Sequence, residues 1–483
     1  MKKLIQKYNS FPIQLKASLW FLLCSFLQKG IATITTPIFT RLMTSDEYGD
    51  FGVFNSWYSI ISIIVSMNLA SGVYTTAMVK FGDNKRVLAS SYQGLTLLLC
   101  SVWIIIYFLF SSFWNGLFHL TTVQMLAMFT MIWASAAFSL WSIEQRVTYN
   151  YKQLVTITIF ASIVQPIVGI ILVVWAEDKV TARILGLAVV ELVCYTGVAI
   201  SQFIRGKVFF SKKYWLYALR FNLPLIPHAL SQTILSSSDR IMIKDIVGES
   251  QAGYYNLAYN ISSIMLIFNI ALSQTLAPWT YQKLKADRAE DINGVAVFSI
   301  GVIGFMNLLL IVLAPEMVRI FAPPEYAEAA YVIPPVAMSV FFMYLYDWFA
   351  RFEYYYEKTH YILIASLTGA LLNLILNYIC IHEFGYIAAG YTTLICYMVY
   401  SFMHYYFMNK ICKQSLPGRK VYNMKMLFSI TGVFLIVGFL LIVTYRSLYL
   451  RYCILALLMF VAIINYKFII RKLKEIVLIR KPR

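Results

Sequence analysis

Two charged side chains stand in the middle of long apolar segments, where both could act in ion binding. Lys29 lies in the run FLQKGIA, and Glu191 lies in LAVVELVCY. A charge at the centre of a membrane costs about 2.5 to 3.5 kcal/mol on insertion scales, so each should face protein or water. The Lys29 ammonium could bind a phosphate group, or it could form an ion pair within a helix bundle. Glu191 could pair with Lys29 or carry a proton, and the sequence supports both roles equally.

A histidine beside two prolines marks a second candidate position. Pro224 and Pro227 precede His228 near the middle of an apolar segment. Proline removes a backbone N–H and bends helices, and interrupted helices in transporters often mark a binding site or a hinge. We therefore expect His228 to face a binding cavity, with hinges at these prolines and, in the first segment, at Gly30 and Pro37. The alternative is a structural kink with a packed histidine.

Charged residues also collect at the predicted outer ends of two segments. The candidates for an outer gate of ion pairs are Arg41, Asp239, Arg240 and Lys244. The alternative is a solvated interface, where an exposed pair contributes at most about 1 kcal/mol. Asp347 and Arg351 are four residues apart, which predicts an ordinary helix-stabilising pair.

Amide side chains recur at helical spacing on two segments. Asn256 and Asn260 share one helix face, as do Asn373 and Asn377. Amides of this kind can line a sugar passage, or they can join helices through hydrogen bonds of about 0.6 kcal/mol. We expect Asn256 and Asn260 to contact substrate, whereas helix joining is favoured for the other two.

Apolar segments long enough to cross a membrane position all of these residues. The chain has 483 residues, of which 60% are hydrophobic and only 13% are charged, which excludes a soluble enzyme. A spanning helix needs about 20 mainly apolar residues. That rule predicts an all-α, polytopic membrane protein with about fourteen spans: 17–39, 51–75, 87–113, 120–141, 153–175, 181–204, 216–238, 252–277, 293–314, 327–350, 359–381, 384–409, 424–444 and 448–469.

The distribution of basic residues predicts the orientation. The 40 Lys and Arg outnumber the 22 Asp and Glu, for a net charge of +18, and most of them fall in alternate loops. Because Lys and Arg concentrate in cytoplasmic loops, both termini are predicted to be cytoplasmic. This placement accounts for the net positive charge without a nucleic-acid partner. The seven cysteines are scattered, so neither a metal site nor a cofactor is expected.

An internal repeat divides the predicted spans. The segment EYGDFGVFNSWYSI from Glu47 aligns without gaps with QAGYYNLAYNISSI from Gln251, matching Gly49 with Gly253. A six-helix repeat in one orientation implies two lobes around a central cavity. We therefore expect a first lobe at 1–210, a second at 211–412, and two additional helices with a basic cytoplasmic tail at 413–483.

Three stretches resemble a known family. They are PIFTRLMTSDEYGDFGVF at Pro37, PLIPHALSQTILSSSDRIMIKDIVGESQAGYYNLAYNI at Pro224, and LLNLILNYICIHEFGYIAAGYTTLICY at Leu371. They are similar to the polysaccharide transporter family, which includes the O-antigen and capsule repeat-unit flippases of the multidrug/oligosaccharidyl-lipid/polysaccharide exporter superfamily. The resemblance implies a V-shaped transporter in the bacterial cytoplasmic membrane. It implies an oligosaccharide linked through pyrophosphate to a polyprenol as substrate.

Two alternatives to such a flippase remain. A multidrug cation antiporter of the same superfamily should carry unpaired acids at mid-membrane, whereas the first lobe has Lys29 as well as Glu191. A membrane-embedded polysaccharide polymerase would need a sizeable outer loop or clustered catalytic residues, and the sequence shows neither. The expected partners are the lipid-linked substrate, membrane lipids and other polysaccharide-assembly membrane proteins.

Overall fold

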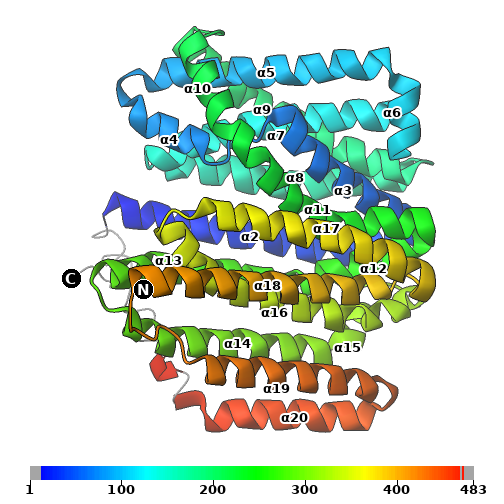
Figure 1. Ribbon diagram of the computed structural model, residues 1–483. Coiled ribbons are helices and arrows are strands. Elements are labelled where there is room, and N and C mark those ends of the chain that lie inside the picture. Colours follow the sequence, from blue (N-terminus) through cyan, green and yellow to red (C-terminus); the bar gives the residue numbers. More distant parts are fainter. Residues whose placement is uncertain (1–11, 468–469, 473–483) are drawn as a thin grey trace, which may run out of the picture. The chain divides into compact units, whose positions relative to one another are not determined.

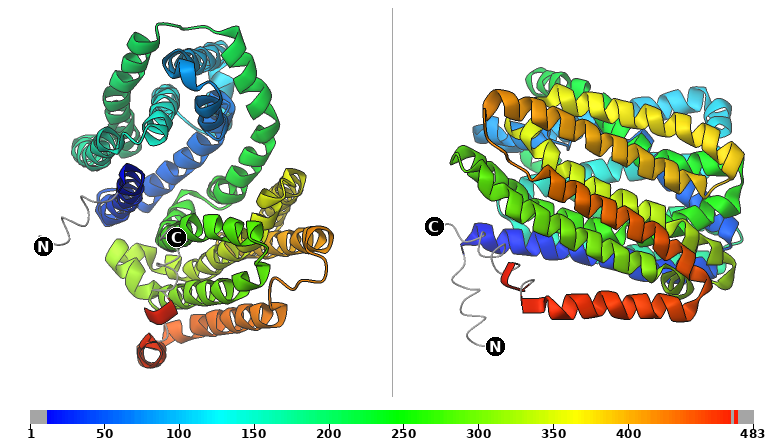
Figure 2. Two further views of the ribbon diagram at one scale, coloured as in Figure 1. Left: turned by 90° about the vertical axis from the view of Figure 1, so that its left-hand side faces the viewer. Right: turned by 60° about the horizontal axis from the view of Figure 1, so that its bottom comes forward.

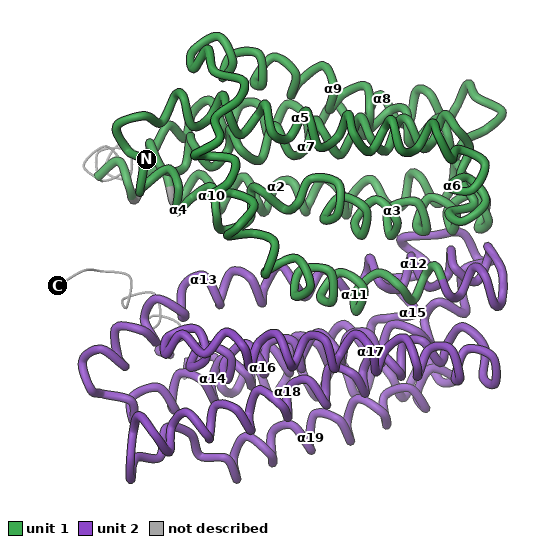
Figure 3. The backbone as a smooth tube through the Cα atoms, turned by 45° about the horizontal axis from the view of Figure 1, so that its top comes forward, with its two compact units in different colours: residues 1–241 green, residues 242–483 purple. Residues whose placement is uncertain are grey.

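The computed structural model describes residues 12–467 and 470–472, and this part of the chain is helical without β-strands (Figure 1). The all-α fold predicted from the sequence is therefore confirmed. The extreme ends of the basic N-terminal segment and of the predicted cytoplasmic tail lie outside the described residues. The chain forms two compact units, residues 1–241 and 242–483, coloured separately in Figure 3.

The first unit consists of long helices that run roughly along one direction, with shorter ones at their ends (Figure 1). Its elements are α2 (Ile13–Leu42), α3 (Ser45–Ser66), α4 (Val73–Lys80), η1 (Gly82–Asn84), α5 (Lys85–Leu109), α6 (Ser111–Phe118), α7 (Thr122–Val147), α8 (Tyr151–Trp175), α9 (Lys179–Gly206), α10 (Lys212–Asn222), η2 (Leu223–Leu225) and most of α11 (Ile226–Ile246). α9 packs against α3, α5, α7 and α8. It is therefore the central helix of this unit.

The second unit has the same general construction. Its elements are α12 (Glu249–Ser262), α13 (Ile264–Lys285), η3 (Ala289–Asp291), α14 (Ile292–Val312), α15 (Ala314–Phe321), η4 (Pro324–Tyr331), α16 (Ile333–Tyr355), α17 (Thr359–Phe384), α18 (Ala388–Ser415), α19 (Met424–Val443), η5 (Thr444–Arg446) and α20 (Leu448–Ile464). α16 lies at the centre and packs against α13, α14, α17 and α18. α19 and α20 pack along α14 and extend this unit (Figure 2).

Capping residues define where several helices of the first unit begin. Thr44 and Glu47 form a reciprocal capping box at the start of α3, and Thr121 and Gln124 form another at α7. Each box satisfies two backbone N–H groups that the first turn leaves without partners. Asp178 caps α9 by accepting a hydrogen bond from the Thr181 backbone. These caps require short polar side chains between apolar runs, which is a pattern visible in the sequence.

The long helices lie at the positions predicted for the membrane spans, but some of the predicted spans are interrupted. Of the helices described, nine are long and apolar enough to cross a membrane, and η4 with α16, bent by 46°, makes ten when the pair is counted as one span. The four other predicted spans coincide with α3, the α10–α11 pair, α18 and the 17-residue α20. The predicted span 51–75 ends earlier than expected, because Met67 and Asn68 have positive φ and terminate α3.

The two glycines that the internal repeat aligns lie at equivalent positions of two helices. Gly49 and Gly253, which the sequence aligns, are each the fifth residue of α3 and α12, and both are buried. The compact units divide at Ile241, within α11, and α10 packs on α4 and α5 of the first unit. The boundaries at residues 210 and 412 remain predictions about functional lobes.

Candidate functional site

Glu191 lies at the centre of a hydrogen-bonded group within the first unit. Ser135 Oγ on α7 donates to Glu191 Oε2 over 3.0 Å, and Gln165 Nε2 on α8 donates to Oε1 over 3.2 Å. Tyr58 OH on α3 donates to Ser135 Oγ over 3.0 Å. Within the described residues Glu191 has no cation at ion-pair distance, so its charge is balanced only by neutral donors. Pairing with Lys29, one of the two roles that the sequence leaves open, is not present.

Contacts at both ends of α7 and α9 hold Ser135 opposite Glu191. Near the start of both helices, Gln124 Nε2 donates to Thr181 Oγ1 over 2.9 Å. Near their far ends, Gln202 Nε2 donates to Glu144 Oε2 over 2.5 Å in the buried interior. Two pairs of this kind prevent one helix from sliding along the other. The register that places Ser135 beside Glu191 is therefore set by side chains more than two turns away from both.

A polar pocket of about 170 Å³ opens beside this group. Its wall comes from α3, α5, α7 and the turn that follows α3, and the polar residues in it are Tyr58, Ser62, Ser66, Asn68, Thr96, Ser135 and Ser139. None of the lining side chains is charged. Hydroxyl and amide groups in this number suit water or a neutral polar ligand better than a lipid chain, which offers no hydrogen bonds.

Lys29 is exposed on α2, and its side chain has no hydrogen bond or ion pair within the described chain. We expect an ammonium near the middle of a spanning helix to face water or a ligand rather than lipid. Its neighbour Gly30 is not required for packing, because a Cβ there would meet nothing within 4 Å. α2 continues through Pro37, whose carbonyl accepts a hydrogen bond from Arg41 Nη1 over 2.8 Å. The hinge at Gly30 and Pro37 remains a prediction.

The helix is interrupted at the two prolines predicted to bend it. α10 ends at Asn222, the 3₁₀ turn η2 contains Pro224, and α11 begins just before Pro227. The buried Asn222 Nδ2 donates to the carbonyls of Met67 and Asn68 over 2.9 and 2.8 Å, which ties the break to the end of α3. His228 is partly buried in the first turn of α11.

The residues predicted to form an outer gate have different surroundings. Asp239 and Arg240 are buried, and Arg240 Nη1 donates to Ser56 Oγ on α3 over 3.4 Å. Lys244 forms an ion pair of 3.3 Å with Glu249, an acid outside the predicted gate. Arg41 is exposed and bonds to its own helix. A gate built from these groups remains a prediction.

The two amide stripes occupy different environments within the second unit. Asn256 is buried and Asn260 is partly buried on α12. Asn377 Oδ1 accepts a hydrogen bond from Thr392 on α18, and Asn373 Nδ2 on α17 donates to Thr393 Oγ1 over 3.5 Å. These last contacts join α17 to α18, which is the role that the sequence favours for them.

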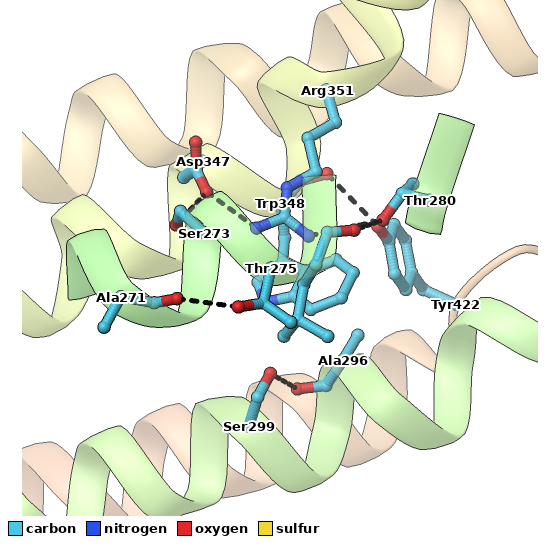
Figure 4. Close-up of polar contacts among 11 residues, drawn as sticks. Ala271, Ser273, Thr275, Thr280, Ala296, Ser299, Asp347, Trp348, Arg351 and Tyr422 are labelled. Carbon is cyan, nitrogen blue, oxygen red and sulfur yellow. Dashed lines mark hydrogen bonds and ion pairs between the residues drawn. The ribbon is translucent and has the colours of Figure 1, made fainter. Parts of the chain in front are cut away.

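A charged network in the second unit is larger than the predicted helix pair (Figure 4). Asp347 Oδ2 accepts hydrogen bonds from Arg351 Nη2 over 2.8 Å and from Ser273 Oγ on α13 over 2.6 Å. Arg351 is only 1% exposed, also donates to Thr280 Oγ1, and lies over the Trp348 ring at 3.8 Å. The i to i+4 spacing indicates the Asp347–Arg351 pair, but only the fold shows that Ser273 and Thr280 on α13 also bond to it.

A fully buried acid–histidine pair involves Glu353, two residues beyond Arg351 on α16. Glu353 and His404 on α18 are joined over 2.7 Å, and both are almost completely inaccessible to solvent. Tyr346 stacks on the His404 ring at 5.3 Å, and Tyr400 contacts it edge-on at 4.5 Å. Neither residue is singled out by the sequence, because an acid and a histidine 51 positions apart carry no local signal.

These features define the class of protein. Long apolar helices in two units, with isolated charges and polar groups in mid-span, describe a multi-pass membrane protein. A solved structure described as the lipid II flippase MurJ in an inward closed conformation matches with a TM-score of 0.71, at 15% identity, over 93% of this chain and 100% of that one. A multidrug resistance MATE family transporter of the MOP superfamily, in an inward-facing conformation, matches with a TM-score of 0.61 at 12% identity, over 81% and 96%.

Sequence comparisons identify the family. The chain belongs to the polysaccharide biosynthesis protein family, whose model matches residues 15–283, more than half of its length. The MatE family model also matches residues 224–379. An uncharacterized membrane protein of Haemophilus influenzae is 20% identical over 370 residues, which covers 74% of this chain and 88% of that protein. The resemblance identified from the sequence is therefore confirmed.

Proposed function

We propose that this protein is a flippase that moves polyprenyl-pyrophosphate-linked oligosaccharide repeat units across the bacterial cytoplasmic membrane. The units would supply the synthesis of a surface polysaccharide such as O-antigen, capsule or exopolysaccharide. The observation that carries this proposal is membership of the polysaccharide biosynthesis family in a chain with the transporter fold. The flippase with the similar fold is described as acting on lipid II, which agrees with a lipid-linked cargo.

The chemistry of the cargo suggests a role for each candidate residue. A pyrophosphate is strongly anionic, and the exposed Lys29 ammonium without an acidic partner in the described chain is suited to bind it. Asn256, Asn260 and His228 offer hydrogen-bonding groups for the sugars. We propose alternating access between two six-helix lobes. The polyprenyl tail stays in lipid, beside a groove formed with α19 and α20.

Glu191 is proposed to couple this movement to protons. Its carboxylate is held by Ser135 and Gln165, two neutral donors that tolerate both protonation states. A charge that moves across the membrane potential contributes about 2.3 kcal/mol per 100 mV, which is enough to bias a conformational equilibrium. In this scheme the protein performs no covalent chemistry and requires no prosthetic group.

Analysis of lipid-linked sugars in a deletion strain tests the function. If the protein is the flippase, the deletion strain should accumulate a polyprenyl-pyrophosphate oligosaccharide on the cytoplasmic side and lose the surface polymer. A plasmid copy should reverse both effects. A deletion strain with normal surface polysaccharide and no accumulated intermediate would contradict the proposal.

A multidrug antiporter is the second candidate, and the match of the MatE model to residues 224–379 favours it. This function predicts that the deletion strain becomes sensitive to organic cations such as ethidium, while its surface polysaccharide stays normal. Measuring drug susceptibility and surface polymer in the same strain separates the two functions. We favour the flippase because the family model with the longer match is the polysaccharide one.

A further inference from the structure

The polar pocket of the first unit ends at the group that holds Glu191. Ser135 belongs to both, since it lines the pocket and its Oγ donates to Glu191 Oε2 over 3.0 Å. Tyr58 also lines the pocket and donates to Ser135 Oγ over 3.0 Å. The same pocket is also lined by Ser66, the last residue of α3, and by Asn68 in the turn that follows, eight and ten residues after Tyr58. The pocket therefore extends from a helix end to mid-span.

The donor order at Ser135 has a chemical consequence. Tyr58 donates to the Ser135 oxygen, so the Ser135 hydrogen is left to point at the carboxylate. A hydroxyl arranged in this way can accept a proton from water on its oxygen while it releases its own proton to Glu191. The exchange moves one proton and leaves Ser135 neutral. Rotation of the hydroxyl then restores the starting arrangement.

We propose that this pocket is the proton entrance for Glu191 and that Ser135 is the last relay group, oriented by Tyr58. The inference rests on the proposed transport function, because it specifies how the coupling proton reaches its site. The entrance lies on the cytoplasmic side, since the basic loops predict that α3 ends there. Protons pass between cytoplasmic water and Glu191 without entering the lipid.

The positions of the charged groups on the surrounding helices indicate that Glu191 is the end of the proton route. Tyr58 and Tyr195 are the ionisable side chains that interact electrostatically with it, and Cys194 is its neighbour on α9. The charged side chains of the helices packed around α9 each lie eight or more residues along their helix from Tyr58, Thr96, Ser135, Gln165 or Glu191, whichever belongs to that helix. They are Asp46, Glu47 and Asp50 on α3, Lys85 and Arg86 on α5, Glu144 and Arg146 on α7, Lys152 on α8, and Lys179, Arg183 and Arg205 on α9.

Accessibility of the pocket provides the first test. Cysteines introduced at Ser62 and Ser66 are exposed to a membrane-impermeant maleimide, added to inside-out or to right-side-out vesicles. Mass spectrometry then quantifies the label at each position. We expect modification in inside-out vesicles, where the cytoplasmic face is accessible. Labelling only from the outer face, or from neither face, would overturn the proposed entrance.

A matched pair of substitutions tests the relay. Ser135→Thr keeps a hydroxyl group. Ser135→Val introduces a side chain with nearly the same shape as threonine but without a hydroxyl group. Loss of a positioned proton-transfer group typically costs about 100-fold or more in rate. We expect Ser135→Val to slow proton exchange at Glu191 by about this factor, while Ser135→Thr stays close to wild type. Ser162→Val is the control, because Ser162 bonds only to the Thr158 carbonyl of its own helix.

Infrared spectroscopy measures this exchange without a transport substrate. After transfer of the protein to D₂O at low pH, the C=O band of the protonated Glu191 shifts as its proton is replaced, and Glu191→Gln identifies the band. Equal exchange rates in Ser135→Val and Ser135→Thr would overturn the relay even if the protein is a flippase. Slow exchange in Ser135→Val alone would support it even in a protein that fails to flip lipid-linked sugars. The two proposals can therefore fail separately.

Discussion

Two carboxylates within the spanning helices differ in the groups that balance their charge. Glu191 accepts hydrogen bonds from Ser135 and Gln165, which are neutral. Asp347 accepts one from Ser273 and forms an ion pair with Arg351. An ion pair adds Coulomb attraction to the hydrogen bond, whereas neutral donors supply the hydrogen bonds alone. The same chemical group therefore has only neutral partners in one unit and a cationic partner in the other.

Lys29 provides the most direct test of pyrophosphate binding. We expect Lys29→Ala to abolish complementation of the deletion strain and Lys29→Arg, which keeps the charge, to retain part of it. Membrane levels of each variant are measured by immunoblot. Lys152→Ala removes another exposed lysine, at the start of α8, and should complement normally. Full complementation by Lys29→Ala would remove this residue from the site.

A double-mutant cycle tests whether Glu191 and Lys29 act independently. Because the two side chains form no ion pair, Lys29→Met should not rescue any defect of Glu191→Gln. Glu191→Gln imitates the protonated carboxyl permanently, so we expect normal expression but a flipping rate that no longer changes with pH. Rates are measured in reconstituted vesicles for all four members of the cycle. Recovery of expression in the double variant would instead indicate a structural pair.

Removal of Asp347 should expose the cost of a buried guanidinium. Arg351 is 1% exposed, so Asp347→Asn leaves its charge without a carboxylate partner. Breaking a fully buried pair typically destabilises a protein by about 3 to 5 kcal/mol, and because the Asp347 side chain is 35% exposed we expect a smaller loss of about 1 to 3 kcal/mol. Thermal unfolding in detergent measures it. The double variant Asp347→Asn with Arg351→Met should recover most of the loss, and equal losses in both variants would contradict this explanation.

At the scale of the elements, glycines set how closely three helices of the first unit approach. A Cβ at Gly186 on α9 would lie 2.8 Å from the Gly169 Cα on α8. A Cβ at Gly169 would lie 3.2 Å from the Phe39 ring on α2. Small residues of this kind allow close backbone packing in membranes, where van der Waals contact drives association. The position of Glu191, five residues after Gly186, depends on this approach.

Alanine substitutions in α9 test this packing with an internal control. Gly186→Ala should destabilise the protein by about 1 to 3 kcal/mol, because the added methyl group meets backbone that cannot move aside. Gly197→Ala lies in the same helix, where a Cβ would meet nothing within 4 Å, and should be neutral or stabilising by up to about 1 kcal/mol. Thermal unfolding compares the two variants. Similar effects at both positions would contradict the packing argument.

Hydropathy predicts the positions of the elements, but it does not predict their breaks. The prolines at 224 and 227 indicate a bend, yet the tie from Asn222 to the end of α3 joins residues more than 150 positions apart. The same limit applies to the site. Lys29 and Glu191 are visible as charges in apolar runs, whereas Ser135, Gln165 and Tyr58 are ordinary residues of apolar helices. Only tertiary packing brings their side chains to one carboxylate.

For the whole molecule, the loops of the first unit fall at two opposite ends. Ser90 near the start of α5 exchanges hydrogen bonds with the backbone of Val208, so the loop before α10 and the start of α5 share one end. Asn115 bonds to Tyr107 at the other end of α5 and to Thr122. A helix of this length, 25 residues, spans about 37 Å, which is enough to cross the hydrocarbon core. Residues near Val208 and near Asn115 should therefore be on opposite sides of the membrane.

Cysteine labelling of intact cells can determine the orientation as well as the number of crossings. The basic loops predict that cysteines at positions 84, 211 and 409, together with both termini, are protected from an impermeant reagent until the membrane is opened. Cysteines at positions 115 and 250 should react in intact cells. Because positions 84 and 211 share one end of the first unit with the Val208 loop, they must be labelled alike. A reversed result at all positions would invert the molecule and move the proposed proton entrance to the outer face. A reversed result at a single position would instead change the number of spans on that side of it.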